Sequence, residues 1–146
     1  GFEVEARKAL GKAWLVGANY TFVDSKVELD RTGSQIQTNL ERPLAGQSQN
    51  VANGLLEFRR GEFRARALVN LFDDRISEVG ALGLPDTIEE GRTTLDVILG
   101  YRFGPFAVRL AGENLTDAEN LFTIDGNQYR FFSTGRSISL GMSYSR

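Results

Sequence analysis

The amino-acid sequence predicts an all-β protein, an antiparallel meander of about seven strands. Along 92–103 and 106–115, apolar residues occupy every second position, and charged or small residues fill the positions between them. Such alternation indicates strands, because successive side chains leave opposite faces of the pleat. The Gly104-Pro105 pair between these segments predicts a tight turn, so that they form an antiparallel hairpin.

The first two strands are expected at 2–9 and 14–22. Apolar and charged residues alternate along the first segment, and the Leu-Gly-Lys sequence at 10–12 then turns the chain. In the second segment, Trp14 and every second residue after it are apolar or aromatic, whereas the opposite face is mostly small or polar. Both segments are therefore expected to have one apolar face.

The next two strands are expected at 51–59 and 63–71. An Asn-Gly pair at 53–54 resembles a hairpin turn, but the alternation continues across it, so that a strand is the better interpretation. The tight turn is placed instead at 60–62. The strand after this turn alternates apolar residues with arginines, and it is expected to continue past Arg75.

The last strand is expected at 135–144, where apolar residues alternate with serine and glycine. The connections between strands alternate in length, and the long, polar ones are 24–49, 77–91 and 117–129. All short turns are therefore expected at one end of the sheet and all long loops at the other. Loops of this length are commonly functional.

The composition excludes several function classes. The chain has 146 residues, enough for one domain, and no linker divides it. Its net charge of −2 gives no basic surface for nucleic acid. It contains no cysteine and no histidine, the commonest general base. We therefore expect no enzymatic activity, no cofactor and no nucleic-acid partner.

Two kinds of barrel fit strands with one apolar face. A lipocalin-like barrel points that face inward, whereas an outer-membrane barrel points it at lipid and lines its lumen with polar residues. Exposing Arg64 and Arg66 to mid-bilayer would cost about 2–4 kcal/mol each, so in a membrane their face must look inward. Aromatic residues near strand ends, as in interfacial girdles, favour the membrane: Trp14, Tyr20, Phe22, Phe58, Phe63, Tyr101, Phe103, Phe106 and Tyr144.

Four passages also resemble the C-terminal barrel region of TonB-dependent outer-membrane receptors. They are Arg-Pro-Leu-Ala-Gly-Gln-Ser at 42–48, Asp-Arg-Ile-Ser-Glu-Val-Gly-Ala-Leu-Gly-Leu-Pro-Asp at 74–86, Glu-Asn-Leu-Thr-Asp at 113–117 and Gly-Arg-Ser-Ile-Ser-Leu-Gly-Met-Ser-Tyr at 135–144. The resemblance implies that 1–146 is the C-terminal portion of a transmembrane outer-membrane β-barrel of the 22-stranded type, in a Gram-negative bacterium. One departure is that such receptors usually end on an aromatic residue, whereas this chain ends Ser145-Arg146.

The resemblance further implies active import of a scarce nutrient, such as an iron–siderophore chelate. The partners would be outer-membrane lipid, a small nutrient ligand, a plug with further barrel strands, and the TonB complex, engaged through an N-terminal region. Strands are expected N-terminal to Gly1, because an open sheet leaves two edges unpaired, and each unpaired backbone group in hydrocarbon costs several kcal/mol. The alternative is a complete small outer-membrane or lipocalin-like binding barrel. A lipid hydrolase is disfavoured by the lack of histidine.

Two sets of residues are candidate sites. Polar-face charges are expected to line the lumen, either as an ion-pair lattice that holds the wall and seats the plug or as contacts to an anionic chelate: Glu57, Arg64, Arg66, Asp96, Arg102, Arg109 and Glu113. Residues expected to face a ligand lie in the long loops: Asn39, Arg42, Gln47, Gln49, Tyr129 and Arg130.

No metal site is expected. A calcium site needs about six to eight oxygen ligands on a turn with regular acidic spacing. Two acidic sets lack that spacing and are interpreted as solvated loop charge: Asp24 with Asp73 and Asp74, and Asp117 with Glu119 and Asp125.

Overall fold

The structure is a computed structural model that describes residues 1–30 and 36–145. These residues form β-strands, turns and irregular segments, which confirms the predicted all-β class. Within the same two ranges, no helix is long and apolar enough to cross a lipid bilayer.

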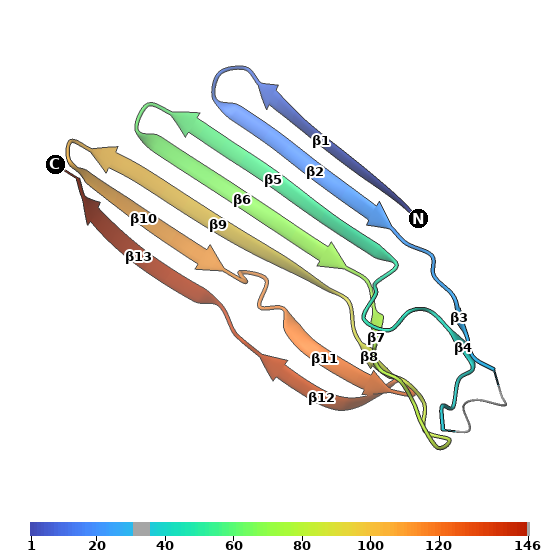
Figure 1. Ribbon diagram of the computed structural model, residues 1–146. Coiled ribbons are helices and arrows are strands. Elements are labelled where there is room, and N and C mark those ends of the chain that lie inside the picture. Colours follow the sequence, from blue (N-terminus) through green and yellow to red (C-terminus); the bar gives the residue numbers. More distant parts are fainter. Residues whose placement is uncertain (31–35, 146) are drawn as a thin grey trace.

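One antiparallel sheet of seven strands contains most of the long strands (Figure 1). Its order is β1-β2-β5-β6-β9-β10-β13, so each strand pairs with the next long strand along the chain, and the predicted meander is confirmed. The strands are β1 (Phe2–Leu10), β2 (Trp14–Phe22), β5 (Asn50–Arg60), β6 (Phe63–Phe72), β9 (Arg92–Phe103), β10 (Phe106–Glu113) and β13 (Ser137–Tyr144). The sheet is open, with β1 and β13 at its edges.

The register joins the apolar positions of all seven strands into one face. One cross-strand row runs Leu10, Trp14, Phe58, Ala65, Leu99, Leu110 and Leu140. The neighbouring row runs Ala9, Leu15, Glu57, Arg66, Ile98, Ala111 and Ser139. Because the pleat sends neighbouring rows to opposite sides, the sheet has an apolar face, which carries Leu110, and a polar face, which carries Arg66.

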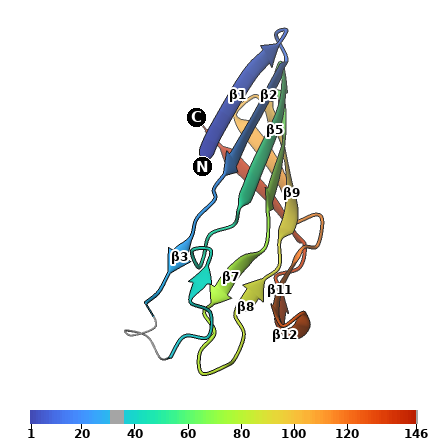
Figure 2. The same ribbon diagram turned by 90° about the vertical axis from the view of Figure 1, so that its right-hand side faces the viewer.

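The sheet is twisted and curved, as two perpendicular views show (Figures 1 and 2). Two hollows, of about 630 and 360 Å³, are lined mainly by residues of the polar face, which is therefore the concave one. The apolar face is left uncovered: Leu110, inside the sheet, is 40% exposed, and Leu140, on its edge strand, is 75% exposed. In the part of the chain that the structure describes, only Ile76, Ala111 and Phe122 are buried hydrophobic residues, so this sheet encloses no apolar core.

Further strands lie beyond the long-loop end of this sheet. A four-stranded sheet has the order β12-β11-β8-β7, and β3 pairs with β4. Their bounds are β3 (Val27–Glu28), β4 (Glu41–Arg42), β7 (Arg75–Glu78), β8 (Thr87–Glu89), β11 (Glu119–Ile124) and β12 (Asn127–Ser133). The connections expected to be polar loops therefore contain strands of their own. Residues 31–35 of the first connection, and Arg146 at the chain end, lie outside the described residues.

The expectation that the strand from Phe63 continues past Arg75 is wrong. Strand β6 ends at Phe72, and β7 belongs to the four-stranded sheet. Two aspartates make the break. Asp73 N donates to Asn50 O at 3.0 Å, and the Asp74 carboxylate accepts a bond from Gly91 N at 2.6 Å. The first bond is the last one of the β5–β6 ladder, and the second ties Asp74 to the residue just before β9, so that the chain can turn away to another sheet.

Candidate functional site

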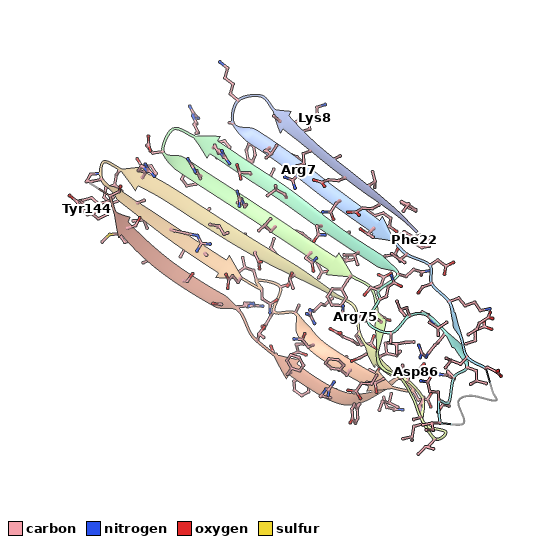
Figure 3. The ribbon with its side chains drawn as sticks, in the orientation of Figure 1. Arg7, Lys8, Phe22, Arg75, Asp86 and Tyr144 are labelled. Carbon is pink, nitrogen blue, oxygen red and sulfur yellow. The ribbon has the colours of Figure 1, made fainter. Side chains whose placement is uncertain are left out.

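A pocket of about 550 Å³ lies among the long connections, with walls from β4, β7, β8 and the segments beside them. We call it the loop pocket. It is lined by four of the six residues predicted to face a ligand: Asn39, Arg42, Gln47 and Gln49. Figure 3 shows two further lining residues, Arg75 and Asp86, in the same region beyond the sheet. Two separate connections, the one between β2 and β5 and the one between β6 and β9, therefore converge on one concave site.

Hydrogen bonds hold one wall of the loop pocket in place. Gly46 N donates to Ile76 O at 2.7 Å, which fastens this wall to β7. The buried Ser48 hydroxyl donates to the carbonyl oxygen of Asp73 at 2.7 Å, just where β6 ends. Because both neighbours of Gln47 are fixed, its side chain starts from a defined backbone position.

Two buried polar atoms of the loop pocket, Arg42 Nε and Gln47 Oε1, have no hydrogen-bond partner among the described residues. The Arg42 guanidinium is held at one point, because its Nη2 donates to Gln37 Oε1 at 3.3 Å. Buried donors and acceptors are nearly always hydrogen-bonded in proteins. The pocket therefore offers one buried donor and one buried acceptor to a ligand.

The charged lining of the loop pocket is mostly acidic: Asp24, Glu41, Asp74 and Asp86 against Arg42 and Arg75. Some of these groups are engaged. Asn39 Nδ2 donates to Asp86 Oδ2 at 2.9 Å. Lys26 Nζ lies 2.6 Å from the Glu28 carboxylate and 3.0 Å from that of Glu41, and so links β3 to β4. Its hydrogen bonds to Glu28 and then to Glu41 raise the pKa of Lys26 above its ordinary value.

Tyr129 and Arg130, the other two residues predicted to face a ligand, do not line the loop pocket. Both are exposed on β12, the edge strand of the four-stranded sheet. The Arg130 guanidinium stacks 4.3 Å from the ring centroid of Phe122, and its Nη2 lies 3.4 Å from Glu78 Oε1. These contacts tie β12 to β11 and β7, so that Arg130 links three strands of the four-stranded sheet.

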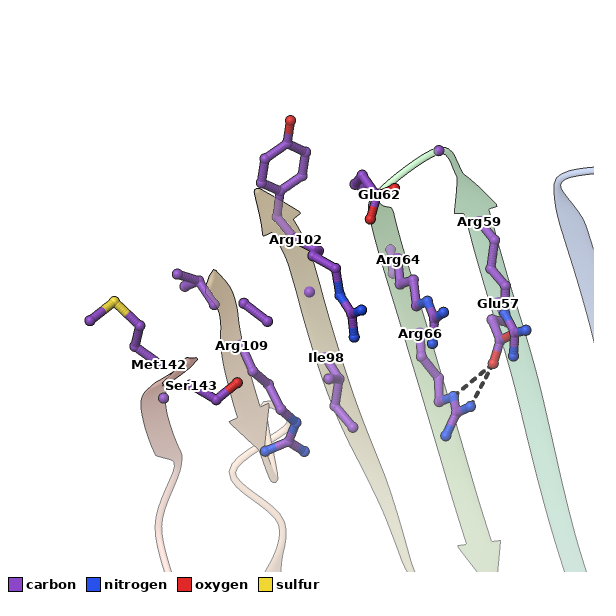
Figure 4. A pocket seen from close by; sticks show the side chains of 17 residues that line it. Glu57, Arg59, Glu62, Arg64, Arg66, Ile98, Arg102, Arg109, Met142 and Ser143 are labelled. Atoms are coloured by element: carbon purple, nitrogen blue, oxygen red, sulfur yellow. Dashed lines mark hydrogen bonds and ion pairs between the residues drawn. The ribbon is translucent and has the colours of Figure 1, made fainter. Parts of the chain in front are cut away.

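The larger hollow of the polar face contains five of the seven predicted lumen charges: Glu57, Arg64, Arg66, Arg102 and Arg109. Arg59 and Glu62 complete its charged lining, and we call this hollow the arginine groove (Figure 4). Glu57 is only 5% exposed. Arg66 donates to Glu57 Oε2 through Nε at 3.0 Å and Nη2 at 2.6 Å, and Arg59 pairs with the other oxygen. One enclosed carboxylate thus serves two arginines.

Asp96 and Glu113, the other two predicted lumen charges, lie outside the arginine groove. Asp96 lines the smaller hollow, and its Oδ1 accepts a bond from Asn114 N at 2.8 Å, where the chain leaves β10. Glu113 is exposed at the end of that strand. The seven charges therefore do not form one continuous lattice.

Two polar networks were not singled out from the sequence. On the polar face, Asn70 donates to Asn53 at 2.6 Å, and Asn53 donates to Asn19 at 2.7 Å, which gives an amide ladder across three strands. All three residues lie at polar-face positions of the alternating pattern, which could have revealed this ladder. The second network centres on buried Glu89, which pairs with Arg75 at 2.8 Å and Arg92 at 3.2 Å. Alternation does not mark it, because Arg75 lies 14 residues before Glu89 in the same connection.

The acidic sets considered for calcium are dispersed or already engaged. Asp74 binds a backbone amide, and the Asp73 carboxylate accepts a hydrogen bond from Asn50. Asp117 Oδ2 lies 3.9 Å from Arg136. Among residues 1–30 and 36–145, no group of three or more His, Cys, Asp or Glu side chains is arranged to hold a metal ion.

The fold defines an open antiparallel sheet with a polar concave face, an uncovered apolar face, and a pocket built from the connections at one end. Comparison with known proteins found no matching family model, no matching curated protein and no matching solved structure. Chemically, the loop pocket can bind a small polar molecule through hydrogen bonds, and the arginine groove can bind negative charge.

Proposed function

We propose that this chain is part of the wall of a TonB-dependent outer-membrane receptor that imports a scarce nutrient. In this role the apolar face meets lipid, the polar face lines the lumen, and the loop pocket receives the ligand outside the membrane. The wall binds and passes its ligand without catalysis. The remaining strands, a plug and the TonB complex are its partners, and the site of action is the outer membrane of a Gram-negative bacterium.

The direction of curvature is the observation that carries this proposal. A lipocalin-like barrel encloses its apolar face, so its strands must curve toward apolar side chains. This sheet has its hollows on the face of Glu57, Arg66 and Asn53. Continued with the same curvature, it would enclose the polar face and leave the apolar one outside, which is the arrangement of an outer-membrane barrel.

Strand length and aromatic placement support the same role. Strands β1, β2, β5, β6 and β9 have nine to twelve residues, close to the length of about 9–11 residues that a tilted strand needs to cross a bilayer. Aromatic residues gather near both ends, with Tyr144 near the short turns and Phe22 near the long loops (Figure 3). At the short-turn end Trp14 and Phe58 lie 4.6 Å apart between ring centroids. Such belts match the two interfaces of a membrane.

The loop pocket narrows the chemistry of the ligand. Its free groups are a guanidinium N–H of Arg42 and an amide oxygen of Gln47, which suit a ligand with both hydrogen-bond acceptors and donors. Its charged lining holds four acids and two arginines, which disfavours a ligand of high negative charge. An iron–siderophore chelate of low charge with carbonyl and hydroxyl groups would meet both conditions.

A labelling experiment tests the proposal on adjacent residues. The chain has no cysteine, so a single introduced cysteine can be modified selectively. Ser139 and Leu140 are neighbours on β13, and their side chains leave opposite faces. In outer membranes we expect a membrane-impermeant maleimide to modify the Ser139→Cys variant and a lipid-soluble maleimide to modify the Leu140→Cys variant. Asn53→Cys and Ala52→Cys on β5 provide a second pair with the same expectation, and the opposite pattern at both pairs would overturn the proposal.

A further inference from the structure

One cross-strand row of the polar face contains only arginine and glycine from β5 to β13. The row runs Arg59, Arg64, Gly100, Arg109 and Gly141. It crosses the arginine groove, where the long side chains of Arg64 and Arg109 stand on either side of a strand position that has none (Figure 4). The row is thus a slot with cationic walls, and the side chain of Arg102 reaches into it from β9 (Figure 4).

The cationic charge of the groove exceeds what its acids neutralise. Five arginines line it, but only Glu57 and Glu62 are acidic. Glu57 is already occupied by Arg59 and Arg66. The side chains of Arg64, Arg102 and Arg109 form no hydrogen bond or ion pair with any residue in 1–30 or 36–145, and like charges this close repel one another. An anionic partner would relieve that repulsion.

The glycines indicate that this partner comes close to the sheet. A Cβ atom built at Gly100 would have Val108 O at 3.9 Å as its nearest neighbour, and one at Gly141 would have Arg109 O at 4.0 Å. Packing within the described chain therefore does not require glycine at either position. Glycine inside a strand weakens it and often marks a place where a ligand or another backbone approaches closely.

The length of the row decides what kind of anion fits. Neighbouring strands lie about 4.8 Å apart, so that Arg59 and Arg109, three strands apart, are separated by roughly 14 Å at the backbone. A single phosphate or carboxylate would occupy only part of this row. An extended polypeptide rises about 3.3 Å per residue, so that acidic residues at alternate positions over five residues would match the arginines.

We infer that the arginine groove binds an extended acidic segment of polypeptide. The segment crosses β5, β6, β9 and β10 with its backbone over Gly100. Its carboxylates pair with Arg64, with Arg109 and with the terminal nitrogens of Arg59, which binds Glu57 through Nε. Arginine suits this task because its planar guanidinium binds a carboxylate through two hydrogen bonds. The inference extends the proposed function in that the segment would lie inside the wall, but the chemistry of the groove does not depend on a membrane.

The test is a titration of the 146-residue protein in neutral detergent micelles. The probe is a fluorescein-labelled peptide with the sequence Gly-Glu-Ser-Glu-Ser-Glu-Gly, and fluorescence anisotropy reports binding. We expect saturable binding that weakens with added salt. Arg64→Gln combined with Arg109→Gln should weaken binding by at least about tenfold, as the loss of two charge-assisted pairs predicts. The matched control, Lys8→Gln with Lys12→Gln, removes the same charge outside the groove and should leave binding within about twofold.

A second variant tests the close approach without altering charge. Gly100→Val fills the floor of the slot with a residue that strands favour, and it should also weaken binding by at least about tenfold. Gly54→Val places the same side chain on the apolar face of β5 and should not affect binding. Circular dichroism of each variant checks that the strand content is unchanged.

Three results would overturn the inference: no saturable binding, equal effects of the groove and control variants, or equally effective displacement by inorganic phosphate at the same concentration of charge. The last result would define a site for small anions only. Failure of the proposed function would be seen separately, as an inverted cysteine-labelling pattern in membranes, because the micelle titration does not report which face meets lipid.

Discussion

Glu57 is the least exposed charged side chain among the described residues, and the hydrogen bonds of its neighbours offset the cost of its burial. Arg66 offers two N–H groups to one carboxylate oxygen, and Arg59 pairs with the other. Both arginines keep about half of their side chains exposed, so that the desolvation cost falls mainly on the glutamate. The result is a local clamp between β5 and β6, beside the unpaired charge of Arg64.

We predict that Glu57→Gln lowers the free energy of unfolding by about 1–3 kcal/mol, because a buried acceptor of charged hydrogen bonds is lost and three arginines are left together. Urea unfolding in micelles, followed by tryptophan fluorescence of Trp14, measures the change. Glu62→Gln is the matched control: it lies on the exposed rim of the same groove and should change stability by no more than about 0.5 kcal/mol. Equal losses in the two variants would contradict the clamp.

The sequence predicts both Arg42 and Arg130 as ligand contacts, but the structure places them in different surroundings. Arg42 lines the loop pocket with a buried Nε that has no partner among the described residues, whereas Arg130 stacks on Phe122 outside it. In the complete receptor that we propose, we expect Arg42→Gln to reduce uptake of an iron–siderophore chelate by about tenfold, the effect of losing one charged hydrogen bond. Arg130→Gln should reduce it less. Radioactive iron uptake, compared at equal surface expression, measures both, and a larger loss for Arg130→Gln would move the ligand site to β12.

At the scale of elements, alternation predicted the strands of the large sheet because each has one polar and one apolar face. It missed β11, where polar residues are buried: Asn120 Nδ2 donates to Phe132 O at 3.4 Å, and the Thr123 hydroxyl donates to Glu90 at 2.6 Å. Such partners come from other segments, so burial cannot be deduced from local pattern. One local signal was available, because Asp125-Gly126, with φ of 50° and 72°, is a typical two-residue hairpin turn.

Like the strands, the candidate site could be predicted only in part from the sequence. All long connections were expected at one end of the sheet, which placed Asn39, Arg42, Gln47 and Gln49 near one another. Which connections meet depends on backbone hydrogen bonds between them, such as Thr38 N to Gly80 O at 3.0 Å and Gly46 N to Ile76 O at 2.7 Å, and no single segment encodes that. Tyr129 was therefore grouped with the pocket although it lies on β12.

One cation, Lys26, bridges the short β3–β4 pair. Lys26 bonds to Glu28 on β3 and Glu41 on β4, and these bonds raise its pKa. A raised pKa means that the folded state binds the proton more tightly than the unfolded state does. The stabilisation is therefore complete below the ordinary lysine pKa of about 10.4 and is lost as pH rises through the higher folded value.

We predict that the two strands separate in that alkaline window. Spin labels on cysteines introduced at Leu29 and Leu40, whose backbones are hydrogen-bonded at 2.8 Å, measure the separation by electron paramagnetic resonance. The distance distribution should be narrow at neutral pH and should broaden above about pH 10.4. In Lys26→Met it should be broad at both values, whereas Lys12→Met, in the turn after β1, should behave like the parent. A distribution independent of pH in the parent protein would exclude this role of Lys26.

At the scale of the whole molecule, the large sheet lacks the second layer that buries the apolar face of a soluble sheet. Its apolar row from Leu10 to Leu140 has no described element against it, and the arginines occupy the concave side. A lipid environment would solvate the first surface, and a hydrated lumen the second. Both faces of the sheet therefore fit such surroundings, whereas its two edge strands lack a partner on one side.

Those edges predict how the isolated chain behaves in micelles. Strands β1 and β13 each pair on one side only, and unpaired backbone groups in hydrocarbon cost several kcal/mol each. Closure of one chain on itself is disfavoured, because the first and last strands of a seven-stranded meander run in the same direction and would have to pair in parallel. A lumen that narrow would also crowd the five groove arginines.

Two copies related by a two-fold axis resolve both difficulties. Each edge then pairs antiparallel with the same edge of the other copy, and two seven-stranded sheets close as one barrel with an even number of strands. We therefore predict a dimer by light scattering after subtraction of the detergent mass. Cysteines at Ser139 should form a disulfide between copies, because this residue lies near the middle of the edge strand β13, whereas cysteines at Asn53, inside the sheet, should not. A monomeric mass without the Ser139 cross-link would show that the edges are satisfied in some other way.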